Sequence, residues 1–164
     1  MNLPNRKPTR LKEYDYSSNG AYFITICTHK RKNLFSKIVG QGLAPAENEL
    51  YPFGKIAEQE LCDLEKRYKA IKIDKYVIMP NHIHAIIAIE NETAGASPCP
   101  TLSDVVCTFK SITTRKCHLL NSDIKLWQTS FHDHIIRDQN DYLKIWNYID
   151  TNPQKRTEDC FYIE

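Results

Sequence analysis

Residues 76–89 constrain the fold more than any other stretch, because they hold two apolar runs on either side of Pro80-Asn81. The first run reads Tyr-Val-Ile-Met, and the second reads His-Ile-His-Ala-Ile-Ile-Ala-Ile. Pro-Asn is typical of a turn, so we predict two strands that pair antiparallel across a tight connection. Successive side chains of a strand point to opposite faces, so His82 and His84 share one face of the second strand.

Two histidines on one face of a strand are compatible with two kinds of site. Imidazole is a common metal ligand, and this spacing offers two imidazoles to one ion. Histidines near a strand end also occur as hydrogen-bonded side chains that bind nothing. His82 and His84 alone therefore do not separate a metal site from a structural pair.

The composition indicates one globular domain. The chain has 164 residues, of which 41% are hydrophobic and 26% are charged, and this length suits one well-cored domain. No apolar run approaches the roughly 20 residues that cross a bilayer, and residues 1–12 lack the apolar core of a signal peptide. We therefore expect a cytoplasmic protein with no membrane partner, whose single domain spans residues 1–164 and begins with a basic arm, about residues 1–13. The six cysteines are scattered and form no Cys-x-x-Cys pair, so we predict reduced thiols.

Basic residues are clustered along the chain, although the formal net charge is only +2. Such clusters bind nucleic acid in some proteins and are ordinary solvated surface in others. For a DNA-binding protein, the candidate contacts would be Arg6, Lys7, Arg10, Lys12, Arg31, Lys110, Arg115, Lys116 and Arg137.

The periodicity of apolar residues predicts strands and helices in the order β, α, β, β, α, β, α. Residues 30–51 show no sustained periodicity and are expected to form an extended loop or a hairpin. The order predicts an α+β, ferredoxin-like fold of the split βαβ class, with a four-stranded antiparallel sheet and helices packed mainly on one face. The expected strands are 21–28, 71–79, 82–89 and 125–136; the expected helices run from 52 or 53 to 68, from a cap at Thr101 or Ser103, and from a cap at Asp138 or Asn140 to Pro153.

The last of these helices carries a second polar group. Its apolar stripe is formed by Tyr142, Ile145, Trp146 and Ile149. At about 100° per residue, Tyr148 and Asn152 lie one turn apart beside that stripe and face outward. Asn152 precedes Pro153, which disfavours the helical conformation, so we expect Asn152 in an irregular last turn. Position alone favours Tyr148 as a phenol at the edge of the core, with its hydroxyl in water.

Four groups of residues, taken together and in order, are recognisable. They are Tyr-Asp-Tyr-Ser at 14–17 with Gly-Ala-Tyr-Phe-Ile-Thr-Ile-Cys at 20–27, Val-Ile-Met-Pro-Asn-His-Ile-His at 77–84, Trp-Gln at 127–128 with Phe-His-Asp-His-Ile-Ile-Arg at 131–137, and Tyr148-Ile149 with Asn152-Pro153. On these residues the chain resembles the REP-associated tyrosine transposases. These are single-tyrosine members of the HUH nuclease superfamily, related to small insertion-sequence transposases.

The resemblance implies a catalytic site and a reaction. It implies that His82 and His84 bind a divalent metal, that Asn152 is a third ligand where some relatives have Gln, and that Tyr148 is the nucleophile. Such enzymes cleave and rejoin single-stranded DNA, usually beside a hairpin, through a 5′-phosphotyrosine bond and a free 3′-hydroxyl. The implied partner is single-stranded or hairpin DNA from repeated extragenic palindromes, bound by a monomer or a homodimer.

The implied ligands suit the chemistry of phosphate. Two imidazoles and one amide oxygen leave a divalent ion its full charge and open positions for phosphate oxygens. Such a site accepts Mn²⁺ readily and Mg²⁺ more weakly, although Mg²⁺ is abundant in cells, so we expect either ion. His134 and Asp133 are candidates to orient a metal ligand. No general base for Tyr148 is identified.

Two other classes of protein stay open. A non-cleaving DNA-hairpin binding protein would use the basic arm for salt-sensitive affinity. A zinc-stabilised or small-ligand ferredoxin-like protein would keep both histidines for structural reasons. The intact set of His82, His84, Tyr148 and Asn152 favours the nuclease.

Overall fold

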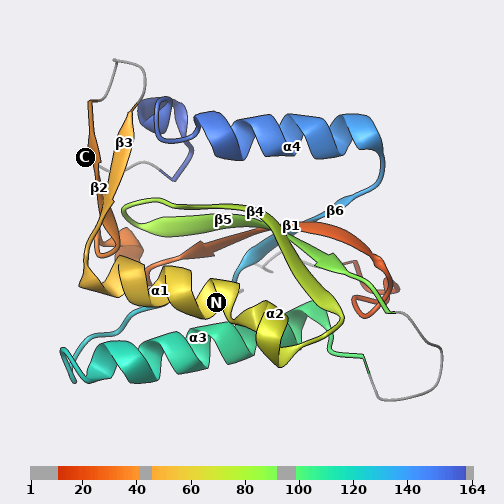
Figure 1. The fold of residues 1–164 in the computed structure, drawn as a ribbon, viewed down its shortest axis with the longest axis horizontal. Helices are drawn as coiled ribbons and strands as arrows, with labels where there is room; N and C mark the ends of the chain where they lie inside the picture. Colours follow the sequence, from red (N-terminus) through yellow and green to blue (C-terminus); the bar gives the residue numbers. More distant parts are fainter. Residues whose placement is uncertain (1–10, 41–45, 92–98, 162–164) are drawn as a thin grey trace, which may run out of the picture.

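Four strands form one antiparallel sheet in the middle of the molecule (Figure 1). The computed structural model describes residues 11–40, 46–91 and 99–161. The strands are β1 (Gly20–Cys27), β4 (Ile71–Ile78), β5 (His82–Ile89) and β6 (His132–Ile136), in the order β4-β5-β1-β6. Strands β4 and β5 pair antiparallel on either side of Pro80-Asn81, as their sequence predicts.

The remaining elements surround this sheet. Strands β2 and β3 pair with each other as an antiparallel hairpin, which decides between the loop and the hairpin expected for residues 30–51. The elements are η1 (His29–Arg31), β2 (Ser36–Val39), β3 (Glu47–Leu50), α1 (Pro52–Cys62), α2 (Leu64–Arg67), α3 (Leu102–His118), α4 (Gln139–Thr151) and η2 (Arg156–Glu158).

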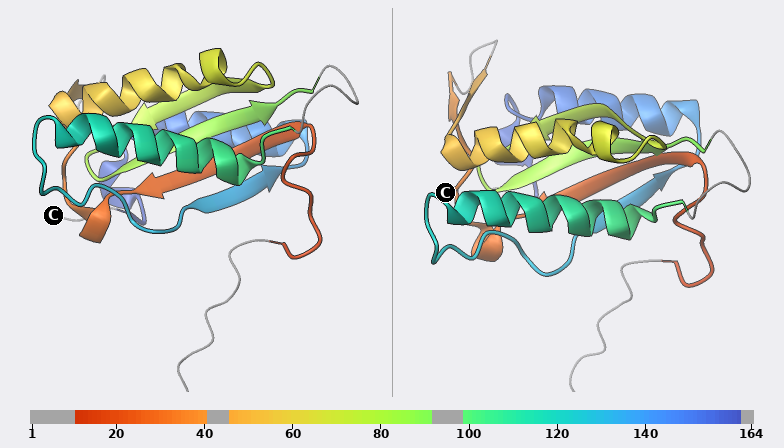
Figure 2. Two further views of the ribbon diagram at one scale, coloured as in Figure 1. Left: turned by 90° about the horizontal axis from the view of Figure 1, so that it is seen from below. Right: turned by 60° about the horizontal axis from the view of Figure 1, so that its bottom comes forward.

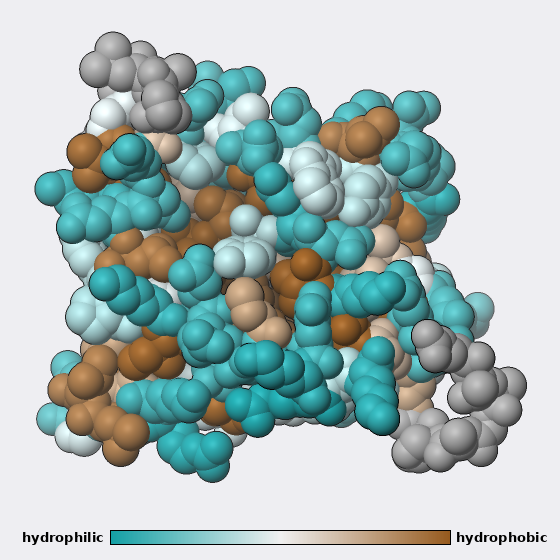
Figure 3. All heavy atoms as spheres, viewed as in Figure 1, coloured by the Kyte–Doolittle hydropathy of each residue, from teal (hydrophilic) through white to brown (hydrophobic). Residues whose placement is uncertain are grey.

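The sheet has a helix layer on each side. Helices α1 and α3 lie side by side on one face, and α4 covers the other (Figures 1 and 2). On this side of the molecule, Figure 3 shows mostly hydrophilic side chains on the outer surface of the helix layers, with apolar side chains visible between them. The predicted fold class is therefore confirmed, with two of the three long helices on one face and α4 alone on the other.

The alternation of β1 explains why the two faces differ. Tyr22, Ile24 and Ile26 are fully buried in the large apolar core, which also includes residues of α1 and α3. The intervening side chains point to the α4 side, where Phe23 contacts the Tyr148 ring and Thr25 contacts His84. One face of the sheet thus supplies most of the apolar core, and the other carries polar side chains beneath α4.

Two predicted elements differ from the observed ones. The helix expected over 52–68 is divided at Asp63 into α1 and α2. The strand expected over 125–136 begins only at His132 as β6. Trp127 makes one isolated bridge to Thr28 and packs in the core, and the Lys110 ammonium binds the carbonyl oxygens of residues 128–130. These carbonyls face a side chain, so no strand ladder forms there.

Side-chain caps begin the long helices α3 and α4, which follow strands β5 and β6 along the chain. Thr101 caps α3 in a reciprocal box with Asp104. Asp138 caps α4 by accepting a hydrogen bond from the Asp141 backbone N–H. Each cap satisfies a helix-end N–H that has no partner within the helix, so both starts agree with the sequence.

Some predictions concern the ends of the chain, membrane spans and the cysteines. Residues 1–10 of the predicted basic arm, including Arg6, Lys7 and Arg10, lie outside the described residues. In the described ranges, no helix combines the length and apolar character needed to cross a bilayer. All six cysteines are free thiols in the structure.

Gly54 lies where α1 passes close to the backbone of Phe35. A Cβ atom at this position would lie 2.1 Å from the Phe35 carbonyl oxygen. We expect Gly54→Ala to lower the free energy of unfolding by about 1–3 kcal/mol, because the clash outweighs the ~1 kcal/mol helix preference of Ala over Gly. Urea unfolding measures this change. Lys55→Ala, at the exposed next position, is the control and should stay within ~0.5 kcal/mol of wild type. Equal stability of wild type and Gly54→Ala would contradict the close contact.

Candidate metal and nucleophile site

Strand β5 places two buried imidazoles on the α4 side of the sheet. His82 and His84 are 2% and 1% exposed, and their ring centroids lie 4.5 Å apart. His82 Nδ1 lies 2.7 Å from Asn81 Oδ1, and His84 Nδ1 lies 2.8 Å from Thr25 Oγ1. Each ring is therefore oriented through its Nδ1 atom, which leaves the Nε2 atoms pointing to a common space.

The hydrogen bonds around Asn81 determine which nitrogen of His82 carries the proton. Asn81 Nδ2 donates to the carbonyl oxygens of Arg31 and Phe161, at 3.4 and 3.0 Å, so Asn81 Oδ1 faces His82. This oxygen only accepts, so His82 Nδ1 must donate, and Nε2 of the neutral ring has a free lone pair. His82 Nε2 is buried and has no hydrogen-bond partner among the described residues, although Asp159 Oδ2 lies 3.1 Å away. A bare, oriented ring nitrogen is the form that binds a metal.

Asp159, just after η2, brings a carboxylate to the same space. Its Oδ2 atom lies 3.1 Å from His82 Nε2 and 3.5 Å from His84 Nε2. Asn152 Nδ2 donates to this oxygen at 2.9 Å, and the Phe161 backbone N–H donates to Oδ1 at 2.8 Å. Ligand atoms of His82, His84 and Asp159 all lie within 4.8 Å of one another. The three side chains form a group of metal-ligand type.

The protonation states agree with this description. Burial acts to raise the pKa of Asp159, but the contacts with His82 and His84 outweigh it and hold the pKa below its ordinary value. Burial lowers the pKa of His84 to about 4. Near neutral pH the site therefore holds an ionised carboxylate beside a neutral imidazole, and these are the states in which both groups bind metals.

Helix α4 brings Tyr148 to this group from the same chain. The Tyr148 hydroxyl lies 3.3 Å from His84 Nε2, and its ring contacts those of Phe23 and His84. Tyr148 is 37% exposed, so its outer edge is open to solvent. Burial is the main cause that raises the pKa of Tyr148, with the charge of Asp159 second.

Asn152 departs from its predicted position. We expected an outward side chain in an irregular last turn, but Asn152 is 2% exposed and has helical φ and ψ of −57° and −42°. Its bond to Asp159 holds the side chain inward, and this outweighs the conformational preference that Pro153 imposes. Asn152 Oδ1 is buried without a hydrogen-bond partner in the structure, so the side chain has a free acceptor.

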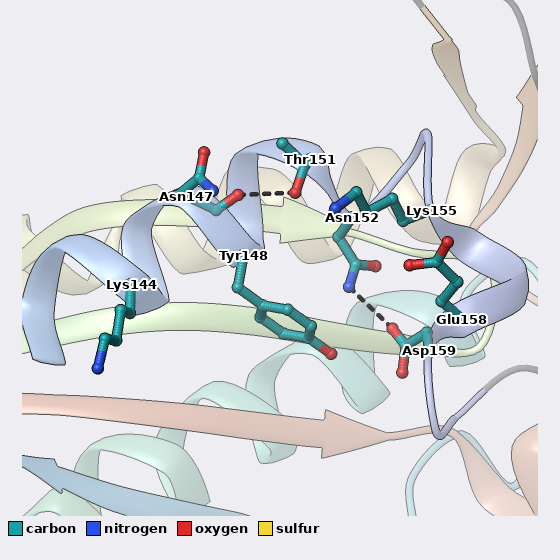
Figure 4. A pocket seen from close by; sticks show the side chains of 8 residues that line it. All are labelled: Lys144, Asn147, Tyr148, Thr151, Asn152, Lys155, Glu158 and Asp159. Atoms are coloured by element: carbon teal, nitrogen blue, oxygen red, sulfur yellow. Dashed lines mark hydrogen bonds between the residues drawn. The ribbon is translucent and has the colours of Figure 1, made fainter.

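A pocket of about 260 Å³ opens beside these residues (Figure 4). One wall is the face of α4 that carries Tyr148, and the other is the segment around η2. The Tyr148 side chain and the Asn152–Asp159 hydrogen bond both lie in the pocket, as Figure 4 shows. The lining residues are Lys144, Asn147, Tyr148, Thr151, Asn152, Lys155, Glu158 and Asp159.

The residues predicted to orient the metal ligands lie elsewhere. His134 donates to Asp141 Oδ2 at 2.7 Å, at the start of α4. Asp133 pairs with Ile24 in the register of β1 and β6, so it lies on the α1 and α3 side of the sheet. The side chains that contact the Nδ1 atoms of His82 and His84, and so orient these rings, are instead Asn81 and Thr25.

Three predicted DNA contacts lie on α3, across the sheet from Tyr148. Lys110 binds backbone carbonyls, and Lys116 contacts the buried carboxylate of Glu60. Arg115 is exposed. Lys110 and Lys116 thus have structural partners, and DNA contact by any of the three stays a prediction.

The other described basic candidates are dispersed. Arg31 lies closest to the site, with its guanidinium 5.2 Å from the Phe161 ring centroid. Phe161 in turn contacts the rings of His82 and His84. Lys12 and Arg137 are exposed, before β1 and after β6 respectively.

Sequence reasoning missed Asp159, Asn81 and Thr25. Asn81 is next to His82, and a carboxamide beside a candidate ligand was a usable signal. Thr25 is opposite His84 only through the register of β1 and β5. Asp159 is 75 residues from His84 and belongs to no motif quoted above, so no local pattern pointed to it.

Comparisons with known proteins agree with the resemblance seen in the sequence. No protein-family model matches the chain. An uncharacterized protein of Haemophilus influenzae is 32% identical over an aligned length of 177 residues. The alignment covers 99% of this chain and 96% of the relative, so the two proteins belong to one family. A second Haemophilus influenzae protein, named "Putative REP-associated tyrosine transposase", is 26% identical over 151 residues, which cover 86% of this chain and 74% of the relative.

A solved structure has the same fold. It is a REP-associated tyrosine transposase bound to a REP hairpin, with a TM-score of 0.64 and 20% identity. The match covers 90% of this chain and 73% of that chain. This likeness confirms the fold class, and with the sequence relative it confirms the resemblance recognised from the motifs.

Proposed function

The chain resembles the REP-associated tyrosine transposases in sequence and in fold, and from this premise we propose that it nicks and rejoins single-stranded DNA beside hairpins. The proposed reaction passes through a covalent 5′-phosphotyrosine intermediate. One observation carries the proposal: the Tyr148 hydroxyl lies 3.3 Å from His84 Nε2, and His84 belongs to the metal-ligand group of His82, His84 and Asp159. A phenol that only borders the core, with its hydroxyl in water, would have no reason to contact His84 in this way.

In the proposed cleavage step, the Tyr148 oxygen attacks the scissile phosphorus. A bond forms between this oxygen and phosphorus, and the bond from phosphorus to the 3′ oxygen breaks. The phenol gives up its proton, and the released 3′ oxygen gains one from solvent, so charge and atoms balance. Rejoining is the reverse attack by a 3′-hydroxyl. Binding in the pocket places phosphate and phenol together, which removes much of the entropic cost of their encounter.

We propose that His82, His84 and Asp159, with Asn152 beside them, hold a divalent cation. The fit rests on two buried atoms without hydrogen-bond partners, His82 Nε2 and Asn152 Oδ1, and on the buried carboxylate of Asp159. A bound Mn²⁺ or Mg²⁺ would supply positive charge that polarises the phosphate. The carboxylate adds a hard oxygen ligand, which both ions favour.

The surrounding residues prepare the site. Asn81 and Thr25 hold the two rings by their Nδ1 atoms. Phe161 contacts both histidine rings, and Phe23 contacts the Tyr148 ring. These aromatic contacts keep water from the nitrogen atoms and limit the positions of the phenol. Within this one chain, His82, His84, Tyr148, Asn152 and Asp159 lie close enough together for the proposed reaction.

The direct test is a covalent adduct. A labelled hairpin oligonucleotide with single-stranded flanks, designed from a repeated palindrome, is incubated with the protein and Mn²⁺ or Mg²⁺ and run on a denaturing gel. We expect a labelled band at the mass of protein plus DNA, and no such band with EDTA. Binding of the hairpin without any adduct, in either metal, would contradict the nuclease and support a non-cleaving hairpin-binding protein.

A further inference from the structure

Four lining residues of the pocket, from α4 and the turn after it, have no part in the chemistry proposed above. They are Lys144, Asn147, Thr151 and Lys155, and all belong to α4 or to the turn that follows it. Figure 4 shows Lys144 and Lys155 on either side of Tyr148 along this segment. The pocket therefore extends beyond the metal-ligand group to residues on both sides of Tyr148.

The two lysines lie on either side of the tyrosine along the chain, one in α4 and one in the turn that follows it. At about 100° per residue, Lys144 and Tyr148 lie on one face of α4, and Lys155 follows the end of this helix in the turn that lines the same pocket. The turn after α4 keeps this geometry at least locally, because the Lys155 backbone N–H bonds to the Thr151 carbonyl at 3.1 Å. Lys144 thus precedes Tyr148 and Lys155 follows it, so one lysine lies on either side of the nucleophile along the pocket (Figure 4).

Lys144 and Lys155 differ from Lys75, which also contacts α4. Both are exposed, and neither forms an ion pair with any carboxylate of the described residues. Lys75, by contrast, lies 2.5 Å from Asp150. Asp141, one turn before Lys144, has its carboxylate bound to His134. The positive charges of Lys144 and Lys155 are thus available to an external anion.

We propose that Lys144 and Lys155 bind backbone phosphates of the single-stranded DNA that flanks the scissile phosphate. This inference rests on the proposed function, which puts the scissile phosphate at Tyr148. Lysine ammonium groups bind phosphate as point charges without reading bases, so the contacts position the strand and carry no sequence preference. Glu158 and Asp159 form the opposite wall of the pocket, so the lysine side is the favourable path for a polyanion.

The salt dependence of binding tests this assignment. Each phosphate contact to a single strand contributes about 0.7 to the slope of log affinity against log salt concentration. We expect the Lys144→Ala/Lys155→Ala protein to bind the flanked hairpin more weakly at low salt, with a slope smaller by roughly 1.4. Between 50 and 200 mM salt, the variant should then lose roughly sevenfold less affinity than wild type. Measurements in EDTA keep cleavage from interfering.

A matched control uses two exposed lysines near the α1 and α2 layer. Lys55→Ala/Lys69→Ala removes the same charge but should leave the slope at the wild-type value. An unchanged slope in Lys144→Ala/Lys155→Ala would overturn the assignment, even if wild type forms the covalent adduct. A reduced slope confined to that variant would support the assignment, even if no adduct forms. The binding surface and the proposed chemistry therefore succeed or fail separately.

Discussion

Tyr148→Phe should lower covalent adduct formation by at least about a thousandfold and leave hairpin binding unchanged, because it removes only the nucleophilic oxygen. The phenylalanine ring keeps the contacts that Tyr148 makes with Phe23 and His84. Labelled DNA on a denaturing gel measures the adduct, and equilibrium binding in EDTA measures affinity. Loss of the adduct with affinity retained would separate chemistry from recognition.

Tyr142→Phe is the matched control, because it removes a hydroxyl from the same helix. The Tyr142 hydroxyl donates to Asp74 Oδ2 at 3.0 Å, away from the histidines. This variant should form the adduct at the wild-type rate. An adduct formed by Tyr148→Phe would assign the nucleophile to another residue and remove the basis of the proposed reaction.

Asp159→Asn should weaken Mn²⁺ binding by at least about tenfold, since the metal loses a charged oxygen ligand. The change is nearly isosteric, and the backbone contact from Phe161 to Oδ1 has an equivalent in the amide. Titration calorimetry gives the affinity directly. Unfolding provides a second readout: at about 100 times the wild-type Kd, Mn²⁺ stabilises wild type by about 2.7 kcal/mol, and a tenfold weaker site gains about 1.3 kcal/mol less.

Asp141→Asn controls for the loss of a carboxylate near a histidine. Asp141 contacts His134 at the surface and lies outside the metal-ligand group. Its Mn²⁺ affinity should equal that of wild type. His82→Gln, which removes a proposed ligand from β5, should weaken Mn²⁺ binding at least as much as Asp159→Asn does. Wild-type affinity in Asp159→Asn would show that the carboxylate is not a ligand, whereas wild-type affinity in His82→Gln would refute the metal site itself.

Local spacing predicted how the side chains within each half of the candidate site lie relative to one another, and the family resemblance supplied their expected roles. His82 and His84 are two residues apart in a strand, and the register of β5 against β1 puts both on one face of the sheet, as predicted. Tyr148 and Asn152 are four residues apart in a helix that begins at its predicted cap, Asp138. The one expectation of this kind that was wrong is the outward direction of Asn152, because its partner is not local.

Local patterns misplaced elements where long-range contacts decide the backbone. Residues 125–131 have the apolar and aromatic content of a strand, yet Trp127 enters the core and Lys110 takes the carbonyls of residues 128–130. The same limit applies to basic residues. Nothing in the sequence indicated that Lys110 and Lys116 have structural partners, because these partners, Gln128 and Glu60, lie far away along the chain.

The strand pair around Pro80-Asn81 remains the feature from which most of this follows. Its alternation was enough to predict two imidazoles on one face, because a strand's side-chain period is a property of the backbone. Which face receives α4, and that Asp159 enters the same space 75 residues beyond His84, depend on how separate elements pack. Packing brings together residues that are far apart in the sequence, and these contacts leave no repeating pattern of residues by which they could be predicted. Local order therefore determined each half of the candidate site, and the layered arrangement of sheet and helices brought the halves together around a carboxylate that neither half contains.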